Sequence, residues 1–197
     1  MTASVRGRGR RATRTALAAG TVGLGLVALA GCQKPSPNAH FTLGSHSESR
    51  ETADDCFAHG DGTLGVDRTQ ECLENAEDVP AFTTKVGDTF RVGVDPEVAD
   101  SGWLLFYDGI LYDTNPFGTT YQTFEIDELT RAVRQQNQQS QQSGQLPEPG
   151  ELRLVVAQVG DGYDAEAIWS ASSQEEYQER LFGSFEGVWN VDLTPES

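Results

Sequence analysis

The residues of this chain that most clearly predict chemistry are its three cysteines, Cys32, Cys56 and Cys72. A thiol can be acylated, can form a disulfide or can bind a metal, and an odd number of thiols in an exported chain requires a separate use for one of them. Cys56 and Cys72 enclose fifteen residues, among them three glycines. Closing such a loop stabilises a fold by about 3 kcal/mol, chiefly by restricting the unfolded chain. We therefore predict a disulfide between Cys56 and Cys72 and a different use for Cys32.

The residues before Cys32 predict that use. The first fifteen residues contain arginines and no acid, and an apolar run from Ala16 to Ala30 follows them. The run is too short to span a bilayer comfortably and is typical of a secretory signal peptide. It ends in Leu29-Ala30-Gly31-Cys32, which resembles the bacterial lipobox, where the cysteine is diacylated and becomes the first residue of the mature chain. We expect residues 1–31 to be a lipoprotein signal peptide. We also expect a lipid such as palmitate on Cys32 to hold the protein at the extracytoplasmic face of the cell membrane.

Two alternatives concern this segment. Ala28-Leu29-Ala30 also satisfies the small-x-small rule for ordinary secretory cleavage, which would release a soluble chain beginning at Gly31. The cysteine count argues against that outcome, because acylation of Cys32 leaves an even pair of thiols. Arg10-Arg11 is compatible with twin-arginine export, although the hydrophobic residues that usually follow such a pair are absent. The general export pathway is favoured, and the route stays open.

The charge of the mature chain excludes one class of partner. Its 166 residues carry 30 acids against 9 bases, a formal charge of −21. Such a surface repels nucleic acid and anionic lipid headgroups. We expect no nucleic-acid partner and attribute most of this charge to solubility and to spacing from an anionic envelope.

Metal-binding patterns are weak in this sequence. His40, His46 and His59 have spacings that match no compact ligand motif. The segment from Asp61 to Asp67 resembles a calcium loop only superficially, since it lacks the third alternate oxygen ligand and the distant glutamate. We expect no metal and no other cofactor.

Catalytic patterns are weaker still. The sequence has no serine nucleophile elbow, no phosphate-binding glycine loop and no free cysteine to pair with a histidine. The adjacent Glu175 and Glu176 fit a solvated helix start, and Asp95 before Pro96 is an ordinary turn residue. Asp100 is the other acid that lies close to the likely core residue Trp103. We expect the protein not to be an enzyme and to have no catalytic residues.

One aromatic cluster stands out around Gly109 and Asn115-Pro116. A loop there could present aromatic rings to a ligand, but packing in the core is the favoured interpretation. The cluster consists of Tyr107, Tyr112, Phe117 and Tyr121.

Short strands account for most of the predicted structure. Thr89 to Val94 alternates, with Phe90, Val92 and Val94 on one face. The strand Trp103 to Tyr107 is expected to follow it through the Asp95-Pro96 turn, and Asp161-Gly162 is typical of a hairpin. The other predicted strands are His40 to Leu43, Asp54 to Ala58, Ala81 to Lys85, Thr119 to Phe124, Leu152 to Val159, Ala165 to Ser170 and Gly187 to Leu193.

Two stretches predict helices. The first begins at Asp127, a candidate N-cap, and carries Leu129 and Val133 on one face before the glutamine-rich residues around 135–150, which we expect to form a loop. The second has a capping box, Ser173-x-x-Glu176, and ends before Gly183.

These elements predict a mainly β fold, an antiparallel immunoglobulin-like β-sandwich with one or two short helices. We expect three parts: the signal peptide 1–31, the lipidated cysteine and a short tether over 32–38, and a single domain over 39–197. Trp103 is the candidate for the buried tryptophan of such a sandwich, although a disulfide closing so short a loop cannot be the inter-sheet bridge of immunoglobulin domains.

The segment Val92-Gly93-Val94-Asp95-Pro96-Glu97-Val98-Ala99-Asp100-Ser101-Gly102-Trp103, followed by Tyr121-x-x-Phe124 and Gly187-Val188-Trp189, resembles an actinobacterial lipoprotein family that is known only as a domain of unknown function. The resemblance covers the chain from the lipobox to the last tryptophan. Its motifs are strand and turn sequences, so it implies no functional residue.

The sequence therefore favours a non-enzymatic binding or interaction module, anchored to the membrane and contacting an envelope protein, a glycan or a small ligand. Two alternatives remain, an exported hydrolase that uses a carboxylate pair and a metal-handling lipoprotein that uses the histidines.

Overall fold

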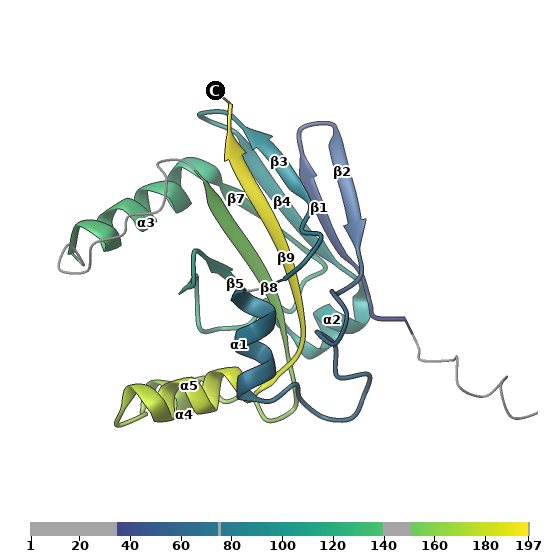
Figure 1. Ribbon diagram of the computed structural model, residues 1–197, viewed down its shortest axis with the longest axis vertical. Helices are drawn as coiled ribbons and strands as arrows, with labels where there is room; N and C mark the ends of the chain where they lie inside the picture. The colour runs from purple at the N-terminus through teal and green to yellow at the C-terminus, as the bar shows by residue number, and fades with distance from the viewer. Residues whose placement is uncertain (1–34, 75, 140–150, 197) are drawn as a thin grey trace, which may run out of the picture. The chain divides into compact units, whose positions relative to one another are not determined.

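The computed structural model of the chain describes residues 35–74, 76–139 and 151–196. These residues form two β-sheets and five helices (Figure 1). The predicted signal peptide, Cys32 and the larger part of the predicted glutamine-rich loop lie outside the described residues. No helix among the described residues is long and apolar enough to cross a membrane.

The first sheet has four antiparallel strands. Their order across the sheet is β2 (His46–Arg50), β1 (Ala39–Leu43), β4 (Thr89–Val94) and β7 (Tyr121–Glu125). The alternation predicted in β4 is confirmed, because Phe90, Val92 and Val94 are buried while Thr89 and Arg91 are exposed.

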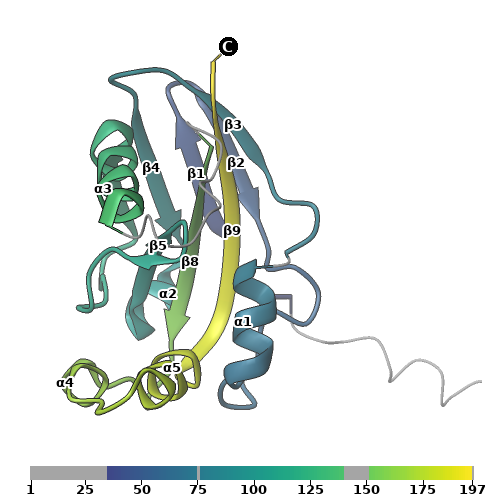
Figure 2. The ribbon, with the colours of Figure 1, turned by 60° about the vertical axis from the view of Figure 1, so that its left-hand side comes forward.

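The second sheet has five strands and one parallel pair. Their order is β3 (Ala81–Thr84), β9 (Phe185–Pro195), β8 (Leu152–Val159), β5 (Trp103–Tyr107) and β6 (Ile110–Leu111). Figure 2 shows β8 and β9 in front of the strands of the first sheet.

Five helices connect and cover the strands. They are α1 (Val66–Glu74), α2 (Pro96–Ser101), α3 (Ile126–Gln139), α4 (Ala165–Trp169) and α5 (Gln174–Phe182). Helices α1, α4 and α5 contribute Cys72, Ile168 and Leu181 to one hydrophobic cluster with β5, β8 and β9.

The second sheet is buried on both faces. One face packs against the first sheet, where Leu105 and Val156 share a cluster with Phe41 of β1. The opposite face, with Leu104 and Val155, packs under the helices. This double burial explains why β5 and β8 are nearly continuous apolar runs, whereas β4 alternates.

The mainly β character and the two-sheet arrangement are confirmed, and the immunoglobulin-like arrangement stays a prediction. The expected one or two short helices were too few, because the described residues form five. The sheets are not entirely antiparallel, since β3 pairs in parallel with β9. Strands β4 and β5 are not joined by a simple turn, because Pro96 begins helix α2 and the two strands belong to different sheets. Proline suits the first turn of a helix, where its missing N–H needs no partner.

Three local predictions were wrong. Residues Ala165–Trp169 form helix α4 instead of a strand, because Oδ1 of Asp164 caps the helix by accepting from the Ala167 N–H. The Asp161-Gly162 turn therefore leads from β8 into a helix and not into a hairpin. Between Asp54 and Ala58 only an isolated bridge of Phe57 with Gly187 forms.

The helix predicted from Asp127 exists, but its ends differ. It begins at Ile126, and Oδ2 of Asp127 accepts from the Gly87 N–H in the turn before β4. Its other end lies at Gln139, so part of the expected loop is helical. Glutamine has good helix propensity, which explains the extension. The predicted buried face, Leu129 and Val133, is confirmed.

The expected tether also differs, since its last three residues pack against the domain. Oγ of the buried Ser36 accepts from the Thr52 N–H at 2.9 Å. The carbonyl oxygen of Pro37 accepts from Nε1 of Trp189 at 3.1 Å. The Asn38 N–H donates to Asp95 at 2.8 Å. The chain is therefore fixed to the fold from Ser36 onward.

Candidate functional site

A cavity of about 530 Å³ lies beside the Cys56–Cys72 disulfide. We call it the disulfide pocket and define it by four segments: residues 50–54 and 56, three residues of α1 (Arg68, Glu71 and Cys72), residues 76–80, and Trp189 with Asn190 of β9. Figure 2 shows helix α1 beside strand β9. The volume lies in the range of small-molecule sites.

An interruption along the edge of β9 creates the opening. The parallel ladder with β3 begins at Asp192, and the isolated bridge with Phe57 lies at Gly187. Trp189 and Asn190, the two β9 residues that line the pocket, fall between these two pairings. The pocket therefore lies where β9 passes from one partner segment to the next.

The disulfide and α1 form one wall. The Cα atoms of Cys56 and Cys72 are 5.8 Å apart, which is ordinary for a disulfide. Thr69 is fully buried on α1, and its hydroxyl donates to the Phe182 carbonyl of α5 at 2.9 Å. The helix is thus attached at two successive turns, and the predicted disulfide is confirmed.

Asn190 is the unusual residue of the pocket. Its side-chain Nδ2 donates to the Cys72 carbonyl at 2.9 Å. A carbonyl only accepts, so this bond fixes the orientation of the amide. Oδ1 is then buried with no hydrogen-bond partner among the described residues, and the whole residue is 8% exposed. A buried acceptor without a donor costs about 1–3 kcal/mol.

The charged groups around the pocket are mostly acidic. Five carboxylates and two arginines line it, a formal charge of −3. Both arginines are already paired with carboxylates, Arg50 with Glu48 at 2.9 Å and Arg68 with Glu71 at 2.8 Å. The other lining carboxylates are Glu51, Asp54, Glu77 and Asp78.

The histidines of the sequence do not meet. His40 contacts Ser49 and Asp95, and His46 contacts Glu48. The rings of His59 and Phe57 lie 5.1 Å apart. Within the described ranges, no group of three or more histidine, cysteine or carboxylate side chains is arranged to hold a metal ion.

Asp95 holds the start of the domain. Burial alone would raise the pKa of Asp95, but hydrogen bonds from the Asn38 backbone N–H and from His40 lower it below the ordinary value. Asp95 thus remains an ionised acceptor that ties Asn38 of the predicted tether to the end of β4. Its role in this structure is positional.

Two carboxyl groups of the described residues have raised pKa values, and neither lines the pocket. Burial raises the pKa of Asp108 in the turn after β5, against the hydrogen bond from the Arg153 backbone N–H. Burial and the nearby Asp161 raise the pKa of Glu186 on β9. Glu186 also accepts from Nε2 of Gln158, which is a structural contact.

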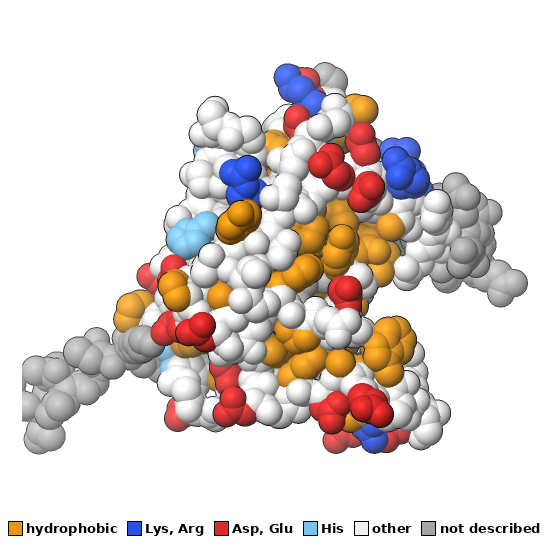
Figure 3. Space-filling model, turned by 180° about the vertical axis from the view of Figure 1, so that it is seen from behind, with side chains coloured by type: hydrophobic (Ala, Val, Ile, Leu, Met, Phe, Trp, Pro, Cys, Tyr) orange, Lys and Arg blue, Asp and Glu red, His pale blue; other side chains and the backbone are white. Residues whose placement is uncertain are grey.

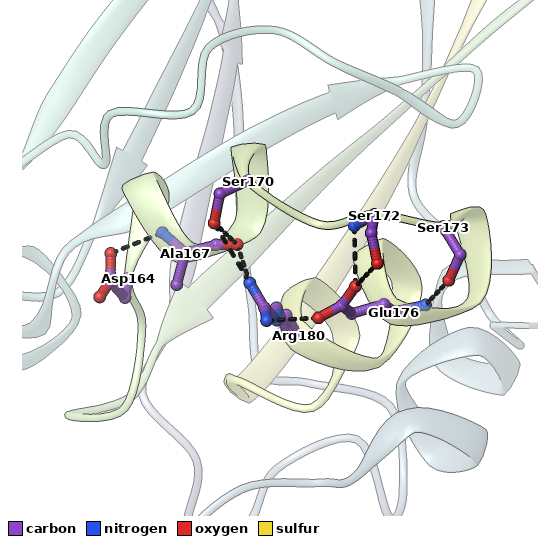
Figure 4. A network of polar contacts seen from close by, with 7 residues as sticks. All are labelled: Asp164, Ala167, Ser170, Ser172, Ser173, Glu176 and Arg180. Atoms are coloured by element: carbon purple, nitrogen blue, oxygen red, sulfur yellow. Dashed lines mark hydrogen bonds and ion pairs between the residues drawn. The ribbon is translucent and has the colours of Figure 1, made fainter.

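The Ser173 N-cap of the predicted capping box is confirmed in the hairpin of α4 and α5, whereas the Glu176 carboxylate accepts from the N–H of Ser172, the residue before the cap (Figure 4). Oγ of Ser173 accepts from the Glu176 N–H at 3.1 Å. Arg180 donates to the Ala167 carbonyl and to the Glu176 carboxylate, which joins the two helices. Hydrogen bonds from the side chain and backbone of Ser172 lower the pKa of Glu176. This carboxylate is therefore engaged in helix structure.

A second region, the aromatic face, consists of the partly or largely exposed Tyr107, Tyr112, Phe117 and Trp169 together with the buried Phe124, which packs against Tyr112 and Phe117. Figure 3 shows hydrophobic side chains gathered on the side of the molecule opposite to the view in Figure 1. The ring of Tyr112 packs 6.3 Å from Tyr107, 6.2 Å from Phe117 and 5.2 Å from Phe124. The predicted cluster thus forms with Phe124 added, while Tyr121 is 62% exposed.

The indole N–H of Trp169 and the hydroxyl of Tyr163, at the aromatic face, are hydrogen-bonded. Nε1 of Trp169 donates to Oγ1 of Thr114 at 2.9 Å, and the Tyr163 hydroxyl donates to the Thr114 carbonyl. Burial raises the pKa of Tyr163 to about 12, so the hydroxyl keeps its proton. The loop before Phe117 is held in place by these bonds.

Sequence reasoning predicted Cys56 and Cys72 but missed Asn190. Its sequence signal is a polar residue within Val188-Trp189-Asn190-Val191, an otherwise apolar part of a predicted buried strand. Comparisons of the chain with protein-family models, with curated proteins and with solved structures gave no match.

Proposed function

We propose that the protein is an exported lipoprotein, anchored through Cys32, whose domain binds a small ligand in the disulfide pocket without chemical conversion. Resemblance to the actinobacterial lipoprotein family of unknown function is part of this proposal. The observation that carries it is the pocket itself, a cavity of ligand size that contains a buried acceptor, Oδ1 of Asn190, with no partner.

The position of the pocket supports the connection with the anchor. Ser36 bonds to Thr52 and Pro37 bonds to Trp189, and both Thr52 and Trp189 line the pocket. An extended chain spans at most ~3.6 Å per residue, so lipid on Cys32 would keep Ser36 within about 15 Å of the membrane surface. The pocket would then sample molecules at the outer face of the membrane.

The described residues favour binding over hydrolysis. An acid–base pair requires two carboxyl groups facing a cleft, with one of the two raised in pKa. The described carboxyl groups with raised pKa values, Asp108 and Glu186, are not lining residues of the pocket.

The anchor is tested by Cys32→Ser in the producing bacterium. We expect the wild-type chain to incorporate labelled palmitate and to fractionate with membranes, and the variant to lose the label and leave the membrane fraction or stay unprocessed. Equal membrane retention and processing of the two chains would contradict the anchor.

The pocket is tested by a photo-crosslinking amino acid in intact cells, placed at Glu77 on the pocket rim and, as a matched control, at Tyr121 on β7. We expect an adduct at position 77 and none at position 121, and its mass distinguishes a small molecule or glycan from an envelope protein. Adducts only at position 121 would reject the pocket as the binding surface.

A further inference from the structure

The unpartnered oxygen of Asn190 determines which hydrogen-bonding group a ligand of the disulfide pocket must have. Because Nδ2 is committed to the Cys72 carbonyl, the group left over is an acceptor. A ligand that satisfies it must donate an N–H or O–H bond. A carboxylate or phosphodiester oxygen has no hydrogen to give at neutral pH and would leave Oδ1 unsatisfied.

The charge of the residues that line the pocket further restricts the chemical class of the ligand. Both lining arginines are occupied by carboxylates, Arg50 by Glu48 and Arg68 by Glu71. The lining residues carry a net charge of −3, and a recessed site focuses such a potential and raises the local concentration of cations. Anionic ligands are repelled, while a cationic donor gains from both the potential and the hydrogen bond.

The burial of Oδ1 sets the shape of the donor. Asn190 is 8% exposed, so a donor has to reach a recessed oxygen. A primary ammonium group is small enough to meet this requirement.

We propose that the disulfide pocket binds a small organic cation whose ammonium group donates a hydrogen bond to Oδ1 of Asn190, among the carboxylates of residues 51, 54, 77 and 78. This inference rests on the proposed binding function and names its ligand class. Free amines and amine-bearing headgroups or sugars of the envelope share this chemistry.

The test is calorimetric titration of the full chain, purified in detergent. Glucosamine and spermidine are the ammonium probes, and N-acetylglucosamine is the neutral match of glucosamine. We expect heat from the ammonium probes, none from the neutral match, and weaker binding as salt is raised, because salt screens exposed charges. Micelles that contain phosphatidylethanolamine distinguish a lipid headgroup, which would compete with glucosamine, from a free amine.

Asn190→Leu removes the acceptor and should weaken ammonium binding about tenfold or more, as expected for a hydrogen bond to a charged group. Gln158→Met is the matched control, since Gln158 is also a buried amide with an unpartnered oxygen but does not line the pocket. Melting temperatures of both variants separate loss of binding from loss of fold.

The contribution of the pocket charge is tested separately with the double variant Glu77→Gln, Asp78→Asn. The matched control is Glu175→Gln, on the exposed start of α5. The pocket pair should weaken binding several-fold and the control should not. Equal binding of glucosamine and its N-acetyl form, or no heat from either ammonium probe, would overturn the ligand class. Crosslinking at position 77 would still succeed in that case, so the two proposals fail separately.

Discussion

The disulfide pocket and the aromatic face both open to solvent, but their polar atoms are satisfied to different degrees. Behind the aromatic face, Nε1 of Trp103 donates to the Thr119 carbonyl at 2.8 Å and Nε1 of Trp169 donates to Thr114. In the pocket, Oδ1 of Asn190 is buried without a partner. The difference indicates that the aromatic rings serve packing, while the pocket retains a polar group for something outside the chain.

The largest expected effect concerns Trp103, the fully buried anchor of the aromatic face, whose ring lies 4.7 Å from Phe117. Trp103→Ala should lower the free energy of unfolding by about 3–5 kcal/mol, as large-to-small core substitutions do. Urea denaturation followed by far-ultraviolet circular dichroism measures it. Trp103→Phe keeps a ring and should cost less. A loss below about 1 kcal/mol for the alanine variant would show that packing does not explain this region.

The next effect concerns the pocket wall. Cys56→Ala combined with Cys72→Ala should lower the free energy of unfolding by about 3 kcal/mol, because the unfolded chain regains the freedom of a fifteen-residue loop. Ammonium binding should weaken as well, since α1 loses one of its attachments. Wild-type protein reduced with dithiothreitol is the matched control and should unfold at the same urea concentration as the variant. Unchanged stability would mean that Thr69 and the core hold α1 without the disulfide.

A smaller, pH-dependent effect tests whether every buried acceptor without a hydrogen-bond partner indicates a ligand site. Oδ2 of Asp108 is buried without a partner, and burial raises the pKa of this carboxyl above its unfolded value. The folded state therefore holds the proton more tightly than the unfolded state, and stability falls as pH rises from the unfolded pKa through the folded pKa. Outside the pocket, such an acceptor should be only a stability cost.

Asp108→Asn should remove this pH-dependent loss, so the gap between variant and wild-type melting temperatures should widen in favour of the variant from pH 4 to pH 7. Asparagine also tolerates the positive φ of 46° at this position. Ammonium binding should not change. A constant gap across that pH range would show that Asp108 titrates as an exposed residue.

The sequence predicted the central strands because their patterns are set by local burial. Thr89–Val94 alternates where one face is buried, and Leu152–Val159 is nearly continuous where both faces are. It did not predict α1, because the loop from Phe57 to Glu71 looks irregular in isolation and the helix is stabilised by contacts with β9 and α5. Parallel pairing of β3 with β9 likewise depends on residues more than a hundred positions apart.

The same reasoning applies to the candidate site. Cysteine counting identified the Cys56–Cys72 wall, because thiol pairing in an exported chain has few alternatives. Asn190 could be noticed as a polar residue in a buried strand, but its unpartnered oxygen depends on Cys72, 118 residues away. The acids of the pocket were indistinguishable from the rest of an acidic chain.

The smallest expected effect on stability concerns Trp169, and it gives the most direct test of the aromatic face against the disulfide pocket. Trp169 is 67% exposed on the aromatic face and makes one side-chain hydrogen bond, to Thr114. Trp169→Ala should change the free energy of unfolding by less than about 1 kcal/mol, because little surface is lost from the core. An exposed tryptophan is nevertheless a common hot spot of protein interfaces, where its removal costs ~2 kcal/mol or more of binding free energy. We expect Trp169→Ala to leave both the adduct at position 77 and ammonium binding intact. If the variant instead lost the adduct while its melting temperature stayed the same, the aromatic face would be part of the binding surface.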